Sequence, residues 1–125
     1  MATINDPDFT VGMLREVIVA LVRREGPSLS AHQLAVFLTC YLASERQTVR
    51  GLAAALNVSK SVITRALDKL GEMQLTRRIP DPADRRSILV EHTITGMKLL
   101  AELRGIAQEV ARDRKEEPLL RAGAA

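Results

Sequence analysis

Two short amphipathic segments separated by only three residues occupy the middle of this 125-residue chain. The first begins after Thr48 and keeps apolar residues at helical spacing as far as Leu56, and the second begins after Ser59 and continues to about Met73. Thr48 and Ser59 are residue types that cap helix N-termini, and Asn57 tolerates the left-handed conformation that ends a helix. Two short helices across so tight a turn predict a helix-turn-helix.

Two β-rich segments follow the helix pair and predict a hairpin. They cover residues 75–79 and 87–93, and the seven residues between them include two prolines and two aspartates, which are typical of an exposed turn. A helix-turn-helix followed by a hairpin is the arrangement of a winged helix-turn-helix, with the hairpin as the wing.

Longer helical patterns flank this region. Helices are expected over residues 7–25, where Asp6 precedes Pro7, and over 31–44, where Ser30 and Gln33 form a capping box. A third is expected over 94–117, ended by Pro118. The first of these helices is apolar nearly all round, and in so small a chain a second subunit would cover its outer side.

We therefore expect a mainly α fold with a small β-hairpin wing, a winged helix-turn-helix that dimerises through its N- and C-terminal helices. Residues 1–117 would form a single domain, with dimerisation helices in 1–44 and 94–117 and a DNA-binding winged helix in 48–93. Residues 118–125 would form a flexible tail.

Positive charge is concentrated in one window of the sequence. Residues 46–86 hold nine basic and four acidic residues, whereas the rest of the chain has a small acidic excess, so that the whole carries +3. The window contains no aromatic residue, although readers of RNA and single strands stack bases on aromatic rings. These features favour double-stranded DNA as the partner. The alternatives are a solvated charged face, a winged-helix adaptor that binds protein, and an architectural DNA binder.

The second helix of the pair, residues 59–73, is the candidate recognition helix. Its apolar stripe is formed by Ile63, Leu67 and Leu70, so its polar side chains lie on the opposite face, where they can enter a major groove. Arg65 can donate two hydrogen bonds to a guanine edge, or else form a surface ion pair with Asp68. The candidate DNA contacts on this helix are Ser59, Lys60, Ser61, Val62, Thr64 and Arg65.

The hairpin turn is the second candidate contact. Arg85 and Arg86 lie in a narrow turn, a shape that fits a minor groove about 6 Å wide. Asp81 and Asp84 would either pair with these arginines or cap the turn. Residues 80–87 would enter the minor groove, and the candidate contacts of the wing are Arg78, Asp84, Arg85 and Arg86.

Several stretches of this region resemble the multiple-antibiotic-resistance regulator (MarR) family. They are residues 48–65, then Leu70, then the run Arg77-Arg-Ile-Pro-Asp-Pro-Ala-Asp-Arg-Arg86, and finally Thr93-Ile-Thr-Gly96. The resemblance implies a homodimer that binds pseudo-palindromic duplex DNA and usually represses transcription. It implies a major-groove position for Ser61, Val62, Thr64 and Arg65, and a minor-groove position for Arg86, steadied by Asp84. It also implies that a small-molecule effector or an oxidant can release the DNA.

The remaining residues predict neither catalysis nor metal binding. His32, His92 and Cys40 lack metal-ligand spacing, and no phosphate loop or catalytic triad is recognisable, so we expect no enzyme activity and no cofactor apart from an unknown effector. Cys40 is expected to be a buried thiol rather than a redox sensor, and His92 a satisfied histidine rather than a pH sensor. Without a membrane span or signal peptide, a cytoplasmic, nucleoid-associated protein with no membrane partner is expected.

Overall fold

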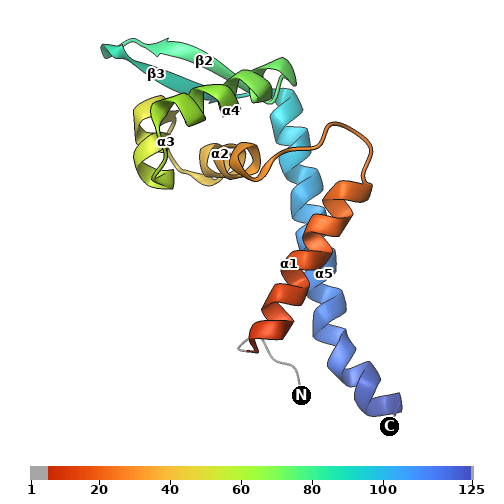
Figure 1. Cartoon of the computed structure of the whole chain (residues 1–125). Coiled ribbons are helices and arrows are strands. Elements are labelled where there is room, and N and C mark those ends of the chain that lie inside the picture. The colour runs from red at the N-terminus through yellow and green to blue at the C-terminus, as the bar shows by residue number, and fades with distance from the viewer. Residues whose placement is uncertain (1–5, 125) are drawn as a thin grey trace. The chain divides into compact units, whose positions relative to one another are not determined.

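The computed structural model describes residues 6–124, with side chains as far as Arg114. The elements are α1 (Pro7–Arg23), α2 (Ala31–Leu42), β1 (Gln47–Thr48), α3 (Val49–Leu56), α4 (Lys60–Glu72), β2 (Thr76–Asp81), β3 (Asp84–His92) and α5 (Ile94–Ala124) (Figure 1). The predicted mainly α fold with a small β-hairpin wing is confirmed. Within the described residues, no helix is both long and apolar enough to cross a membrane.

The chain divides into two compact units. The winged unit comprises residues 29–100 and contains α2, β1, α3, α4, β2, β3 and the start of α5. The flanking unit comprises the described residues up to Ser28 and those from Ala101 onward, so that it contains α1 and most of α5.

Local signals in the sequence set the helix boundaries of the winged unit. The Ser30 hydroxyl accepts a hydrogen bond from the Gln33 N–H, and the Gln33 side chain accepts one from the Ser30 N–H, which completes the predicted capping box. Ser59 accepts a hydrogen bond from the N–H of Val62 and so caps α4. Asn57 ends α3 in the left-handed region at φ 54°. The predicted helix-turn-helix is thus confirmed, with the turn at residues 57–59.

One apolar core joins the helices of the winged unit to its sheet. Its fully buried side chains come from α2, α3, α4 and β3, so that each element turns one face inward. They are Val36, Phe37, Cys40, Leu52, Ile63, Leu67, Leu70 and Val90. The inward stripe predicted for the recognition helix is therefore correct, and it fixes which side chains of α4 face solvent.

The sheet has three antiparallel strands in the order β1-β3-β2. The sequence predicted only the hairpin, whereas β1 adds a short edge on which Gln47 pairs with Val90 and Thr48 with Leu89. The hairpin is also longer than predicted, because β2 runs to Asp81 and β3 begins at Asp84. The prediction that all of residues 80–86 form a turn is therefore wrong.

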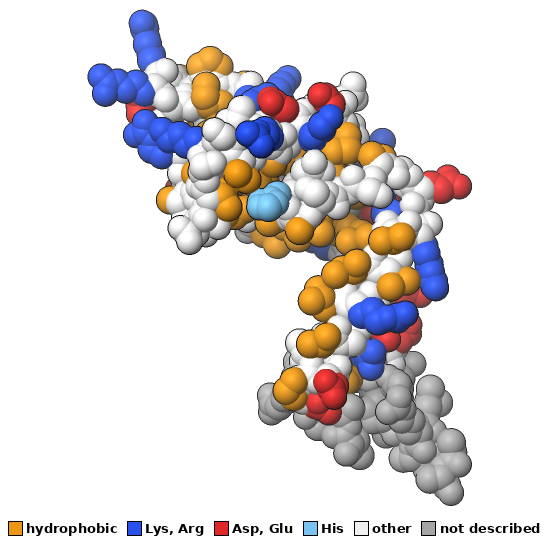
Figure 2. Space-filling model, viewed as in Figure 1, with side chains coloured by type: hydrophobic (Ala, Val, Ile, Leu, Met, Phe, Trp, Pro, Cys, Tyr) orange, Lys and Arg blue, Asp and Glu red, His pale blue; other side chains and the backbone are white. Residues whose placement is uncertain are grey.

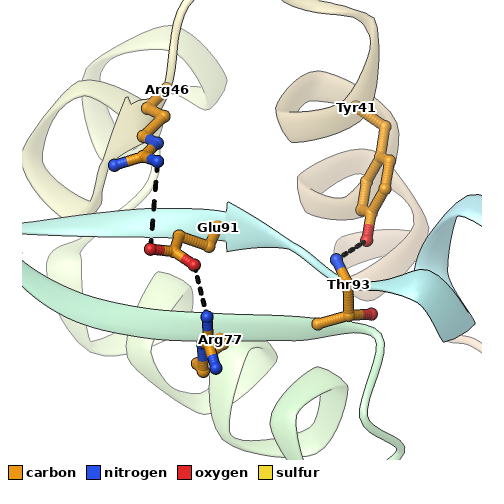
Figure 3. A network of polar contacts seen from close by, with 5 residues as sticks. All are labelled: Tyr41, Arg46, Arg77, Glu91 and Thr93. Carbon is orange, nitrogen blue, oxygen red and sulfur yellow. Dashed lines mark hydrogen bonds and ion pairs between the residues drawn. The ribbon is translucent and has the colours of Figure 1, made fainter.

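Tyr41 links three segments of the winged unit. Its hydroxyl donates a hydrogen bond to the backbone oxygen of Leu75 at 2.6 Å. The same hydroxyl accepts one from the N–H of Thr93 at 3.0 Å (Figure 3). Its ring stacks on Phe37 on one side and on His92 on the other. The end of α2 is thereby fixed to both ends of the hairpin.

In the flanking unit, ion pairs join α1 to α5. Arg24 pairs with Glu102 at 2.7 Å, and Arg114 pairs with Glu16 at 2.9 Å. Arg114 also lies over the ring of Phe9. A line of apolar side chains along α1 is exposed (orange in Figure 2), formed by Val11, Leu14, Ile18 and Val22.

Helix α5 continues beyond the predicted end at residue 117. It runs through Pro118 to Ala124, so the predicted end of the helix at residue 117 is wrong, and the flexibility of 118–125 stays a prediction. Proline removes one backbone hydrogen bond, but the residues after it are mostly leucine, arginine and alanine, which favour helix. Ala125 lies outside the described residues.

Candidate nucleic-acid interface

The outward face of α4 carries short polar side chains and two long cations. Lys60, Ser61, Thr64 and Arg65 are exposed, and Val62 is half-buried at the edge of this face. They point outward because Ile63, Leu67 and Leu70 fix the opposite face in the core. The helix therefore presents hydrogen-bond donors and the apolar side chain of Val62, the chemistry that reads base edges in a major groove.

Arg65 does not form the surface ion pair that the sequence left open. The carboxylate of Asp68 instead accepts a hydrogen bond from Arg78 of β2, with 2.6 Å between Oδ1 and Nη2. Among the residues whose side chains are described, none forms an ion pair with Arg65. Its guanidinium is therefore available to a ligand. Arg78, which the sequence placed among the DNA contacts, is engaged with the recognition helix.

The tip of the hairpin is held by its aspartates. Asp81 accepts a hydrogen bond from the N–H of Ala83, and Asp84 accepts hydrogen bonds from the N–H of Arg86 and the hydroxyl of Ser87. Of the two roles considered for these aspartates, the structure shows capping of the turn.

The two arginines at the tip lie in β3, directly after its first residue, Asp84. Both Arg85 and Arg86 are exposed, and within residues 6–114 neither forms an ion pair. Figure 2 shows Lys and Arg side chains (blue) projecting from this end of the hairpin. The wing thus offers two unpaired cations on a narrow support.

A groove of about 490 Å³ lies between the helix-turn-helix and the wing. Arg50, Lys60, Arg78 and Arg86 line it together with the hydroxyls of Thr48, Thr64 and Ser87. Four cations and three hydroxyl groups around one groove favour an anion such as a phosphate. Sequence reasoning missed Arg50, although it lies in the basic window two residues after the helix cap Thr48.

Part of the basic window is neutralised on the sheet. Glu91 of β3 pairs with Arg77 of β2 at 2.7 Å and with Arg46, just before β1, at 3.9 Å (Figure 3). The hydrogen bond from Arg77 lowers the pKa of Glu91, and the same contact raises the pKa of Arg77. Arg46 and Arg77 are therefore engaged on the sheet, and among the described side chains of this window the positive charge without an ion pair lies on α3, on α4 and at the hairpin tip.

Of the residues considered for other chemistry, Cys40 lies in the core, whereas His32 and His92 are exposed. Cys40 is buried, as expected, and burial raises the pKa of its thiol to about 12. His92 is satisfied, since its Nε2 lies 2.8 Å from the backbone oxygen of Cys40 and its ring stacks on Tyr41. Among the described residues, His, Cys, Asp and Glu side chains do not gather in a group that could bind a metal.

Known proteins share this architecture. The sequence profile of the MarR family matches residues 29–88. The solved structure of the transcriptional regulator BldR from Sulfolobus solfataricus is 32% identical, with 90% of this chain and 75% of that chain covered, at a TM-score of 0.60. The solved structure of a mutant of MarR from E. coli is 27% identical, with 87% of this chain and 75% of that chain covered, at a TM-score of 0.63.

A more distant structure is the S. aureus MepR–DNA complex, which is 17% identical, covers 92% of this chain and 89% of that chain, and has a TM-score of 0.67. Among curated proteins, none matches the chain. The profile match, the similarity to BldR and the winged unit lead to one assignment: this chain belongs to the MarR family of transcriptional regulators, which are not enzymes.

Proposed function

We propose that the protein is a transcriptional regulator that binds a specific site in double-stranded DNA and acts there as a repressor. Helix α4 would enter the major groove through Ser61, Val62, Thr64 and Arg65. Ser59 and Lys60, at the N-terminus of α4, would contact a phosphate. The wing would enter the minor groove through Arg85 and Arg86, with Asp84 capping the turn. Arg78, through its contact with Asp68, would support the DNA-binding surface of α4.

The observation that carries this proposal is the set of unpaired arginines in the winged unit. Arg65 on α4 and Arg85 and Arg86 on β3 are exposed, and among the described side chains they have no carboxylate partner. Other cations of the same window, Arg46, Arg77 and Arg78, are engaged with carboxylates. The MepR–DNA complex supports the proposal, because a protein of the same fold is seen there with DNA.

We further propose that the protein acts as a homodimer joined through its flanking units. The apolar stripe on α1 supports this, since Val11, Leu14 and Val22 each expose more than half of their surface. Burying such side chains against a second copy is favourable. A two-fold dimer would place its recognition helices about 34 Å apart, so the two half-sites should lie one helical turn apart.

The test is to map the genomic fragments that the purified protein retains and to measure affinity against salt. We expect a discrete pseudo-palindromic site, and an affinity that falls with salt by about 0.9 in log K per unit of log concentration for each phosphate contacted. Diffuse coverage would indicate an architectural binder instead. Lack of duplex affinity at low salt, together with capture of a protein, would indicate an adaptor.

A protein with these properties would work in the cytoplasm, on the nucleoid. A small-molecule effector that releases the DNA is part of this proposal. It would be recognised by a change in the affinity for the mapped site when the compound is added.

A further inference from the structure

We propose that Arg78 is a positioning residue for base recognition, because it holds the carboxylate of Asp68 and so keeps Arg65 unpaired. This inference rests on the proposed binding of DNA by α4. It gives Arg78 an indirect role and leaves Arg65 as the residue that touches the base.

The position of Asp68 on α4 makes it a competitor for Arg65. The two residues lie three apart, a separation at which side chains on a helix meet and can form an ion pair. The other positions three or four residues from Arg65 hold Ser61, Val62 and Lys69, so Asp68 is the one acidic side chain within reach along the helix. Arg65 and Asp68 also line one groove of about 550 Å³ between α2 and α4.

Arg78 resolves this competition from the neighbouring strand. Its Nη2 lies 2.6 Å from Oδ1 of Asp68, within the range of a strong charge-assisted hydrogen bond. Arg78 lines the groove on the wing side of α4, whereas Asp68 lines the groove on the α2 side. The pair therefore fixes the recognition helix to β2 while it occupies the carboxylate.

Without Arg78, the Asp68 carboxylate would oppose DNA binding in two ways. It would pair with Arg65, and that pair would have to break before the guanidinium could reach a base edge. Its uncompensated negative charge would also repel nearby phosphates. Both effects disappear if Asp68 is neutralised at the same time, which separates this role from a direct contact between Arg78 and DNA.

The test compares R78M, D68N and the double variant D68N/R78M on the mapped DNA site. R77M and R77M/E91Q are the matched controls, because Arg77 is the adjacent arginine of β2 and its partner Glu91 lies on the sheet. We expect R78M to weaken binding by about three- to tenfold more than R77M does. We expect D68N/R78M to bind within about twofold of R77M/E91Q, and D68N alone to bind no more weakly than the wild type.

Two results would overturn the inference. Equal losses for R78M and R77M would show that Asp68 does not compete, and a double variant as weak as R78M would show that Arg78 itself contacts DNA. Thermal unfolding of each variant identifies a loss of fold. If R78M does not fold, the affinity of D68N for the mapped site tests the proposal by itself. Weaker binding by D68N than by the wild type contradicts the proposal.

A second readout requires no DNA. In the free protein, the NMR Nε–Hε signal of Arg65 should shift in R78M and return to its original position in D68N/R78M. A signal that stays unchanged in R78M overturns this inference alone. A wild-type protein without affinity for duplex DNA overturns the proposed function, so the two failures are distinguishable.

Discussion

The hydroxyl oxygen of Tyr41 occupies the space that a Cβ atom at Gly96 would need. The oxygen cannot move aside freely, because it donates a hydrogen bond to the carbonyl of Leu75 and accepts one from the N–H of Thr93. The carbonyl of Leu75 lies against the same position. The start of α5 can therefore approach α2 this closely only with glycine at position 96.

Replacing Gly96 with alanine should destabilise the protein by about 2–3 kcal/mol, because the added methyl group meets atoms that hydrogen bonds hold in place. Gly105 of α5 is the matched control, since a Cβ atom there meets nothing within 4 Å. Gly105→Ala should stabilise the protein by about 0.5–1 kcal/mol through helix propensity. Urea unfolding followed by circular dichroism measures both, and equal effects of the two substitutions would contradict this account.

Replacing Gln74 with glycine should stabilise the protein. Gln74 has a φ of 60°, in the left-handed region that costs a residue with a Cβ atom about 1–2 kcal/mol. Part of the gain is lost because glycine gives the unfolded chain more freedom, so we expect a net gain of about 0.5–1 kcal/mol. Asn57→Gly, at φ 54°, is the comparison and should gain less, because asparagine tolerates this region. A lower midpoint of thermal unfolding for Gln74→Gly would show that the Gln74 side chain stabilises the fold by more than its left-handed backbone destabilises it.

The thiol of Cys40 should resist alkylation in the folded protein. Burial raises its pKa from 9.0 to about 12, and only the thiolate reacts readily. At pH 8, iodoacetamide should therefore modify the native protein at least about a hundredfold more slowly than the urea-unfolded protein. Because the folded state keeps the proton longer, this group's contribution to stability is complete below pH 9 and decreases as the pH rises toward 12. Rapid native labelling would instead indicate an accessible, reactive cysteine.

Glu91 should make stability depend on pH in the acid range. The hydrogen bond from Arg77 lowers its pKa below the ordinary 4.5, so the contribution of the pair is present above that value and is lost as the pH falls through the lowered pKa. In Glu91→Gln this part of the dependence should disappear. Glu72→Gln, which removes the partner of Lys69 within α4, is the comparison. Chemical unfolding between pH 3 and pH 7 measures the difference, and parallel curves for wild type and Glu91→Gln would refute the expectation.

The two groups of DNA contacts should behave differently when they are removed. Arg65→Ala should weaken binding by about 1–3 kcal/mol and relax the preference at one base position, because it removes contacts to a base edge. Arg86→Ala should weaken binding with little change in base preference in the major groove, since a minor-groove arginine reads mainly the groove's width. Binding to a library of site variants measures both properties. If both variants bind as the wild type does, the proposed contacts are wrong.

The helices of the winged unit could be predicted from the sequence because their signals are local. Ser30, Thr48 and Ser59 cap helices within three residues of themselves, and the spacing of Ile63, Leu67 and Leu70 selects the face of α4 that is buried. The outward residues of the recognition helix follow from that face. The roles of these residues toward DNA stay predictions.

Local sequence signals could not predict three features of the fold. These are strand β1, the length of the hairpin and the continuation of α5 beyond residue 117. Residues 47 and 48 become a strand only because Val90 and Leu89, more than forty positions away, lie beside them. Pro118 disfavours a helix by about 3 kcal/mol, and yet α5 continues through it to Ala124. Each of these features depends on a balance between a local preference and its surroundings.

The sequence by itself determined where the helices of the winged unit begin and end, and which face of α4 is polar, because capping and apolar spacing act within one or two turns of a helix. Only the tertiary structure decided which charges are left for a ligand. Arg65 could equally have paired with Asp68, and it is unpaired because the fold brings Arg78 from another element to that carboxylate. The partner of a surface charge depends on residues that approach through space, and the distance between them is set by the packing of β2 against α4.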